Sequence, residues 1–265
     1  MINIKHYLFS LIFLTSLSCA ALAKQVNQEN STDLSVEADI SIEWFEKEKY
    51  YLAKGNVVLK KNGLTLKANI VRADYGIENG VNILKNITAK EEVILTKGKS
   101  RAKGQFMTYD VEKKIVIISG SFQTFSSPTG YVESKKIIMF DDLKNKAMAK
   151  GNVKIILSNK NVIFADSVKA DFTAKDKSLH KAIAKGNVII ESKEKGKKSK
   201  ADLGIYNSSD QVVRLSGNVI IINQNSILNG SKGITNLKTG ISNIIGNPKK
   251  KERVKGIFSP IKKNK

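Results

Sequence analysis

A five-residue pattern recurs along this chain at nearly constant spacing and limits its possible folds more than any other feature. Ala-Lys-Gly-Asn-Val occurs at residues 53–57, 149–153 and 184–188, and Ser-Gly-Asn-Val follows at 216–219. Two degenerate copies fill the gap between the first two, Ala-Lys-Glu-Glu-Val at 89–93 and Ile-Ser-Gly-Ser-Phe at 118–122. The six copies give a period of about 32 residues, which is typical of a repeat architecture.

A second landmark follows each copy in register with the first. A small residue lies 11 to 15 residues after the centre of each copy: Ala68, Ala102, Ser134, Ala165, Ala201 and Gly230. An aromatic residue then closes five of these segments: Tyr75, Tyr109, Phe140, Phe172 and Tyr206. Two landmarks that keep register are harder to obtain by chance than one recurring pentapeptide.

The period within each copy is that of β-structure. Apolar residues recur at every second position after the glycine, as in Val57 and Leu59, and many are β-branched, which indicates strands. Turn signals such as Lys61-Asn62-Gly63 separate these runs, and only three prolines occur in the chain. We therefore predict an all-β fold of about fourteen strands, each of roughly 8–12 residues, joined as antiparallel hairpins.

The Gly-Asn pair has two interpretations. It is a known two-residue hairpin turn, but it also suits a bulge or bend within one long strand. We favour the bend, because the apolar run before each glycine is short and a stronger turn signal follows several residues later. Bends repeated at one place in every copy would crease the sheet along a line.

The N-terminus has the features of an export signal. An apolar run at residues 7–17 is followed by Ala21-Leu22-Ala23, a typical cleavage site, so residues 1–23 are predicted to be a signal peptide. Cys19 suggests lipidation, but Ser16 stands where a leucine is expected. We expect a flexible linker at 24–34, one domain at 35–247 and a disordered basic tail at 248–265, in a periplasmic protein.

The residue inventory argues against several functions. The net charge is +21, but export and an aromatic content of only 7% disfavour nucleic-acid binding. The two histidines, His6 and His180, do not form a cluster, and the mature chain would contain no cysteine. No nucleophile–base pair, metal site or cofactor motif is apparent, so we predict a protein that is not an enzyme and needs no cofactor.

Two long segments resemble a known family. "YLAKGNVVLKKNGLTLKANIVRADY" (51–75) and "AMAKGNVKIILSNKNVIFADSVKADF" (147–172) are similar to the LptA/OstA-like N-terminal domain family, and residues 35–57 resemble its opening hairpin. The resemblance covers residues 35–245. It implies a bent antiparallel β-jellyroll, shaped like a folded taco, and a periplasmic component of lipopolysaccharide export. The length of the chain and the Glu91-Glu92 copy depart from the family pattern.

The resemblance also implies a binding surface and partners. Lipid A acyl chains would lie in a groove lined by Val57, Leu59, Leu66, Ala68, Val93, Leu95, Phe122, Val153, Ile155, Ile163, Ala165, Val188, Ile190, Val219 and Ile221. Rim lysines would contact lipid phosphates: Lys54, Lys60, Lys61, Lys150 and Lys185. Copies would join head to tail through edge strands within 35–45 and 234–245, between LptC-like inner-membrane and LptD-like outer-membrane jellyroll partners.

Two alternatives remain open from the residues alone. The apolar positions could form the closed core of an exported structural β-repeat scaffold that carries no lipid. The chain could also be the membrane-anchored LptC-like partner of the same export system, although the A-x-A sequence favours release. The basic tail is either a passive solvated segment or a tether to anionic lipid head groups.

Overall fold

The computed structural model describes residues 34–192, 196–223, 226–239, 241–247 and 252–258. The predicted signal peptide and nearly all of the predicted linker lie outside these ranges. Within them the chain forms eighteen strands and no helix, which confirms the all-β antiparallel prediction. Among the described residues, nothing helical has the length and apolarity needed to cross a membrane.

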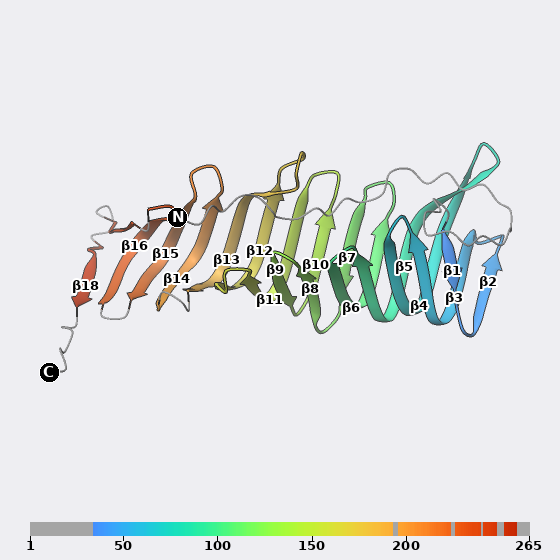
Figure 1. Cartoon of the computed structure of the whole chain (residues 1–265), viewed down its shortest axis with the longest axis horizontal. Helices are drawn as coiled ribbons and strands as arrows, with labels where there is room; N and C mark the ends of the chain where they lie inside the picture. The colour runs from blue at the N-terminus through green and yellow to red at the C-terminus, as the bar shows by residue number, and fades with distance from the viewer. Residues whose placement is uncertain (1–33, 193–195, 224–225, 240, 248–251, 259–265) are drawn as a thin grey trace. The chain divides into compact units, whose positions relative to one another are not determined.

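The described strands fall into two compact units. Figure 1 labels most of these strands and colours the chain from blue at the N-terminus to red at the C-terminus. The N-terminal unit contains described residues 34–128 and 135–146, and its long strands pair with their neighbours in the sequence from β2 to β7. Its strands are β1 (Ser35–Glu37), β2 (Ser41–Phe45), β3 (Tyr50–Lys61), β4 (Leu64–Glu78), β5 (Val81–Lys97), β6 (Ser100–Asp110), β7 (Ile115–Ser119), β8 (Gln123–Ser127) and β10 (Ile137–Asp141).

The C-terminal unit contains residues 129–134 and the described residues from 147 onward. It is also an antiparallel meander, in which β12 to β17 pair in sequence order and β9 pairs with β11. Its strands are β9 (Gly130–Ser134), β11 (Lys146–Leu157), β12 (Val162–Phe172), β13 (Leu179–Ser192), β14 (Lys197–Asn207), β15 (Val212–Asn223), β16 (Ser226–Asn236), β17 (Ser242–Ile245) and β18 (Lys255–Phe258).

The described strands outnumber the fourteen expected because several strands are short. The fourth copy breaks its strand: β7 ends at Ser119 and β8 begins at Gln123, with Gly120 between them at a φ of 137°. Short strands also occur in pairs at the two ends of the chain. Both β1 and β2 pair with β3, while β17 and β18 both pair with β16.

The strand β18 lies within the segment that the sequence predicted to be a disordered tail. Lys255–Phe258 pairs with the Ser226–Asn229 part of β16, the half that β17 leaves uncovered. The physical reason is local, because Gly256-Ile257-Phe258 is a short apolar run within the basic segment and can pair with an open strand edge. Residues 248–251 and 259–265 of the predicted tail lie outside the described ranges.

Each of the four Gly-Asn pairs in the repeats lies inside a continuous strand, as the favoured interpretation predicted. In β3, Gly55 and Asn56 both have positive φ, of 82° and 41°, and the pairing with β4 shifts between Lys54 and Val57. The same left-handed pair occurs in β11, β13 and β15, and pairing shifts are recorded at those in β13 and β15. Glycine reaches this conformation without steric cost, and asparagine tolerates it better than most residues.

Side chains on the neighbouring strands fix these bulges. Asn187 donates its side-chain amide to both carboxylate oxygens of Asp166, at 3.2 and 3.0 Å, and Asn218 donates to Asp202 at 2.9 Å. In the N-terminal unit, Asn56 donates to Asp39 at 2.7 Å, and Asp39 lies in the connection between β1 and β2. The asparagine therefore has two functions: it accepts the left-handed backbone and ties the bulge to the adjacent strand.

Candidate functional site

In each of the two units, buried valines lie directly after the bulges. Each valine is the residue that follows the left-handed pair, so its side chain points to the inner face of the sheet. The exposed fraction of these side chains is 0% for the first and 1% for the other four: Val57, Val93, Val153, Val188 and Val219. This set is named the valine row.

A second apolar position lies two residues after each valine and on the same face. Leu59 and Ile221 are 3% and 8% exposed, whereas Leu95, Ile155 and Ile190 are only partly buried. Ile163, which pairs with Ile190 across β12 and β13, is also partly buried. The inner face is thus closed at the bulges and, on β5, β11 and β13, more accessible toward the strand ends.

The predicted positions on the intervening strands complete this face. Leu66 pairs with Leu59 on one side and Leu95 on the other, and Ala68 pairs with Val57. Leu66, Ala68 and Ala165 are all buried. Fourteen of the fifteen predicted groove residues are therefore buried or partly buried; the structure does not test whether they bind lipid.

Small residues let the two halves of each strand pack together across the bulge. In the C-terminal unit, Leu215 lies before the bulge, and it forms one buried cluster with Ala201, Val219 and Ile221 from beyond it. A Cβ atom added at Gly233 would lie 3.1 Å from Val219 and 3.8 Å from Ile221. The inner face of this unit is thus closely packed near the bulges.

Phe122 is the one predicted groove residue that differs. It is 50% exposed, and the neighbouring Gln123 is fully buried. The break at Gly120 adds one residue to this copy. The first residue that faces inward is therefore the third after the glycine, whereas it is the second in the Gly-Asn copies. As a result, Gln123 occupies the place that a valine occupies in other copies, and Phe125 pairs with Ala102 in the next row.

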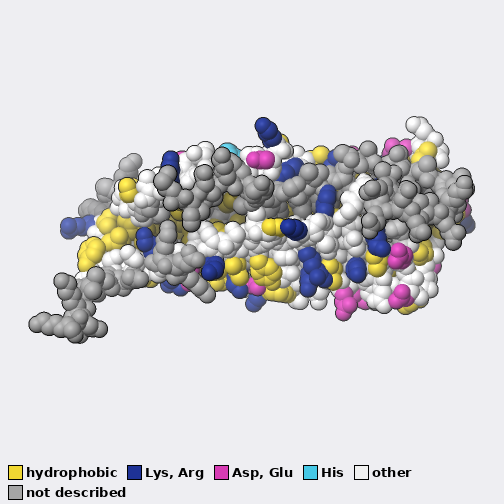
Figure 2. Space-filling model, viewed as in Figure 1, with side chains coloured by type: hydrophobic (Ala, Val, Ile, Leu, Met, Phe, Trp, Pro, Cys, Tyr) yellow, Lys and Arg dark blue, Asp and Glu magenta, His cyan; other side chains and the backbone are white. Residues whose placement is uncertain are grey.

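The predicted rim lysines do not share one environment. Lys54 forms an ion pair with Glu43 at 3.0 Å, and Lys60 forms one with Glu37 at 3.6 Å. Lys150 and Lys185 are exposed, and the visible face mixes basic and acidic side chains (Figure 2). Lys61 is only 8% exposed, so it lies on the inner face rather than at a solvated rim.

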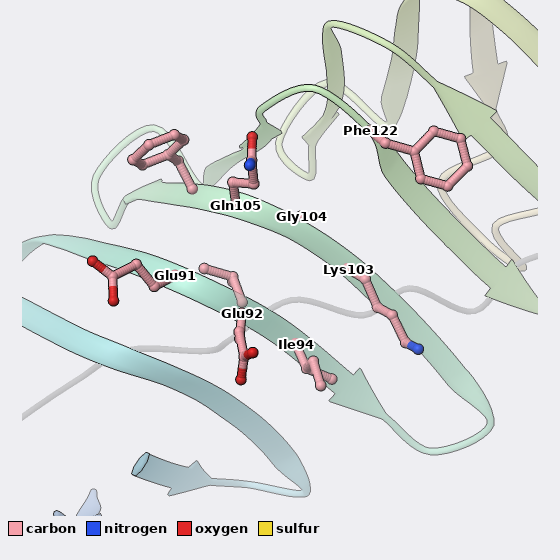
Figure 3. Close-up of a pocket in the computed structure, with 9 residues that line it drawn as sticks. Glu91, Glu92, Ile94, Lys103, Gly104, Gln105 and Phe122 are labelled. Carbon is pink, nitrogen blue, oxygen red and sulfur yellow. The ribbon is translucent and has the colours of Figure 1, made fainter. Parts of the chain in front are cut away.

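The third copy forms a surface depression instead of a regular Gly-Asn bulge. Glu91 and Glu92 both have positive φ, of 63° and 55°, and Asn69 donates a hydrogen bond to Glu91 at 2.8 Å. The depression has a volume of about 570 Å³ and lies along β5 and β6 (Figure 3). Lys103 and Phe122 also line it, so it mixes acidic, basic and aromatic groups.

Apolar side chains are exposed at both chain ends. In the N-terminal unit, Trp44 of β2 is 57% exposed, stacks on Tyr51 at 6.0 Å, and donates to the Tyr75 hydroxyl at 2.8 Å. In the C-terminal unit, Ile257 and Phe258 of β18 are 60% and 73% exposed, and they pair with Ile227 and Ser226 of β16. Trp44 lies within the N-terminal edge segment predicted for assembly, 35–45, whereas β18 lies outside the predicted C-terminal segment, 234–245.

The acidic, histidine and apolar side chains of the described residues limit the kinds of site that this structure can form. No group of three or more His, Cys, Asp or Glu side chains within them could hold a metal ion. His180 lies exposed in β13. The arrangement that repeats is an apolar inner face with charged outer positions, which suits an amphipathic ligand or a packed core.

The comparisons with known proteins identify the class. A family model described as the LptA/LptD N-terminal domain lipopolysaccharide transport protein matches residues 35–142 and 131–241. The chain belongs to this lipopolysaccharide transport family, as its repeats and starting hairpin predicted. The two matched segments overlap only at 131–142, so the family pattern occurs twice along the chain.

Two other comparisons add detail. A search of curated proteins found no match. A crystal structure of LptH, the LptA-homologous periplasmic component of the conserved lipopolysaccharide transport device of Pseudomonas aeruginosa, is similar to this chain at 14% sequence identity and a TM-score of 0.23. The similarity covers 86% of this chain and 96% of that chain.

Proposed function

We propose that this chain is a periplasmic lipopolysaccharide-binding protein that carries lipopolysaccharide between the inner and outer membranes along its apolar inner face. The observation that carries the proposal is the inner face itself. In both units a fully buried valine row is followed by leucine and isoleucine side chains, several of which are more accessible. Family membership supplies the ligand class. Acyl chains on this face would gain about 0.8 kcal/mol per buried CH₂ group.

The decisive experiment compares adjacent residues on opposite faces of one strand. Ile190 lies on the inner face of β13 and Ile189 on the outer face, and both are partly buried. Ile155 and Ile156 form a second such pair in β11. Ile190→Ser and Ile155→Ser should each weaken lipopolysaccharide binding about tenfold, because each removes several apolar carbons from the lipid contact.

The outer-face variants Ile189→Ser and Ile156→Ser are the matched controls. They make the same chemical change in the same strands and should leave binding within about twofold. Binding is measured by titrating labelled lipopolysaccharide, and folding is checked by the urea midpoint of far-UV circular dichroism. Equal effects of inner and outer variants, or loss of folding without selective loss of binding, would favour a closed structural core.

The alternatives make different predictions about purified protein. A β-repeat scaffold would carry no lipid after gentle extraction from a lipopolysaccharide-producing host, and mass spectrometry would detect this. An LptC-like partner would retain its N-terminal segment as a membrane anchor. The bridging function predicts instead a cleaved chain that copurifies with lipopolysaccharide.

End-to-end assembly is part of the proposal. The edges formed by β1 with β2 and by β17 with β18 would pair between copies and with LptC-like and LptD-like jellyroll partners. The Asn236 N–H donates to the Ile241 carbonyl, so the alternation of an antiparallel pair turns the Ile244 N–H of β17 away from β16. Ile244→Pro should therefore reduce oligomer size without unfolding the chain. The control Ile244→Ser shortens the side chain but keeps the N–H. Unchanged light-scattering mass for Ile244→Pro would refute edge pairing.

The exposed rim lysines would add outer contacts to lipid phosphates. Lys54, Lys60, Lys150 and Lys185 are solvent-accessible to different degrees, and two of them already have carboxylate partners. Exposed ion pairs contribute between 0 and about 1 kcal/mol and are screened by salt. We therefore expect each of these lysines to contribute little individually.

A further inference from the structure

Two lysines face inward at one end of the N-terminal unit. In β3 the buried positions alternate as Val57, Leu59 and Lys61, while Lys60 between them is exposed. In β5 the same alternation from Val93 through Leu95 leads to Lys97. Because side chains of a strand alternate between faces, Lys61 and Lys97 share the face of the valine row.

The strand register places these lysines in one row. Lys61 pairs with Leu64 of β4, Leu64 pairs in turn with Lys97, and Lys97 pairs with Ser100 of β6. We name these four residues the end row. Their two lysines are separated by two strand spacings, about 10 Å between Cα atoms, so two long side chains can reach one bound group between them.

Lys61 is buried, unlike the other predicted rim lysines, and Lys97 is partly buried. Lys61 is 8% exposed, although lysine is rarely buried in proteins. Burial lowers the pKa of Lys97, and the charge of Asp142 acts in the opposite direction. The end row therefore combines two cationic groups with a nearby carboxylate at the margin of an apolar surface, where charge interactions are stronger than in water.

We propose that Lys61 and Lys97 bind the phosphate of a phosphorylated lipid head group whose acyl chains lie on the inner face of the N-terminal unit. The inference rests on the proposed lipopolysaccharide function and refines it by naming the residues that recognise the head group. Ammonium groups donate charge-assisted hydrogen bonds to phosphate oxygens. Leu59 and Leu95, two residues closer to the bulges, are placed to contact the first part of the acyl chains.

The matching positions of the C-terminal unit support this assignment. Six residues after the centre of each bulge, where β3 and β5 have lysine, β11, β13 and β15 have Leu157, Ser192 and Asn223. Lys197, which pairs with Ser192, is exposed. The inward-facing lysine pair is thus a property of the N-terminal unit and not a general consequence of the basic composition.

The test uses full-length protein and two lipids, bisphosphorylated lipid A and the same lipid A after enzymatic removal of its phosphates. The wild type should bind the phosphorylated form at least tenfold more tightly. Lys61→Met and Lys97→Met keep side-chain length but remove the charge, and each should reduce that preference about tenfold, or 1.4 kcal/mol. Lys61→Arg should retain it.

Neighbouring lysines provide matched controls. Lys67→Met lies on the opposite face of β4, between the inward-facing Leu66 and Ala68, and Lys99→Met lies in the exposed turn after β5. Both lower the net charge by the same amount and should leave the phosphate preference within about twofold. Inorganic phosphate at millimolar concentration should not displace lipid A, because the acyl contacts are missing from it.

The outcomes separate this inference from the proposed function. A wild-type protein that binds both lipids equally would retain the carrier function and overturn the inference. Failure of the wild type to bind either lipid would overturn both. Equal losses for both lipids in Lys61→Met and Lys97→Met would show a structural role, and efficient displacement by inorganic phosphate would show a site for free phosphate. Either result would refute the head-group assignment.

Discussion

The two units have the same repeat but differ in how regularly they follow it. All three copies in the C-terminal unit have a Gly-Asn bulge inside a continuous strand, and in β13 and β15 an aspartate on the neighbouring strand accepts from the asparagine. The N-terminal unit has one such copy, at Gly55. Its other two have Glu91-Glu92 in place of Gly-Asn and a strand break at Gly120.

Comparing the two units shows which positions of the repeat stay the same in both and which positions differ. Both units keep buried valines directly after their bulges, because that position lies at the closed part of the inner face. The N-terminal unit varies the bulge residues and the end row, where its depression and inward-facing lysines lie, and its last copy replaces the valine with the buried Gln123. Regular copies therefore build the apolar face, and irregular copies supply specific polar groups.

The largest expected effect comes from disrupting a regular bulge. Gly186 has a φ of 77°, and a Cβ atom there would lie close to the Asp166 carboxylate. Gly186→Val should lower the free energy of unfolding by about 3 kcal/mol, because a β-branched residue is strained in the left-handed region and the carboxylate must move. Urea denaturation followed by circular dichroism measures the change.

Two controls make this prediction specific. Lys185→Val places the same side chain at the preceding exposed position of β13 and should change stability by less than about 0.5 kcal/mol. Gly186→Asn should lower the free energy of unfolding by less than Gly186→Val does, because asparagine tolerates the left-handed region. If Gly186→Val and Gly186→Asn lower the free energy of unfolding equally, backbone strain is not the reason that glycine is needed at this position.

The next effect concerns two tyrosines, the buried Tyr109 in the N-terminal unit and the partly buried Tyr206 in the C-terminal unit. Burial raises the pKa of Tyr109 to about 12, with further contributions from the charges of Asp142 and Asp110. Burial also raises the pKa of Tyr206, with a contribution from Asp210. In both cases the folded state retains the phenol proton to higher pH than the unfolded state does.

The contribution of Tyr109 to the free energy of unfolding should therefore be constant below pH 10 and should decrease as the pH rises from 10 to 12. The loss should reach about 2 kcal/mol by pH 12, since one pKa unit corresponds to about 1.4 kcal/mol. Tyr109→Phe should remove this part of the decline. The measurement is the difference between wild-type and variant unfolding free energies across that range, and a constant difference would contradict the prediction.

A smaller effect of opposite sign is expected at the strand break. Gln123 is fully buried, and neither polar atom of its side chain has a hydrogen-bond partner within the described structure. Gln123→Leu replaces it with an apolar side chain of similar size and should raise the free energy of unfolding by about 1–2 kcal/mol. In contrast, Val219→Gln at a regular copy should be strongly destabilising. A destabilising Gln123→Leu would indicate that the amide is satisfied in solution.

The sequence predicted the regular parts of this molecule and missed the irregular ones for physical reasons. The period of two after each glycine was sufficient to place Val153 and Val188 on the inner face. The extra residue at Gly120 could not be placed from that period, so Phe122 was expected where Gln123 lies. Pairing of Lys255–Phe258 with β16 depends on an edge left open by the short β17, which a basic composition does not show.

The lysines are a different case, because the signal was present in the sequence. Counting by twos from Val57 and Val93 leads to Lys61 and Lys97 on the inner face. Lysine is so commonly exposed that Lys61 was expected at the rim and Lys97 was not selected. Alternation within a well-defined strand was the better guide here.

The smallest expected effect tests the strain in the irregular copy. Glu91 has a φ of 63°, which costs a non-glycine residue about 1–2 kcal/mol, but it also accepts a hydrogen bond from Asn69. Glu91→Gly removes the strain, the exposed hydrogen bond and some backbone restriction in the unfolded chain. These contributions oppose one another, so the net gain should be about 0.5 kcal/mol. Urea denaturation is again the measurement.

Asn69→Ala separates the two contributions at this copy. It removes the hydrogen bond to Glu91 and leaves the left-handed backbone unchanged, so it should be destabilising by about 0.5–1 kcal/mol in the wild type and nearly neutral in Glu91→Gly. Such a result would show that the N-terminal unit retains a strained glutamate whose cost is partly offset by one contact. If Glu91→Gly is destabilising by more than 1 kcal/mol, Glu91-Glu92 stabilises the bulge of β5 more than glycine does at position 91. Glycine would then not be the most stable residue at the first bulge position of every copy.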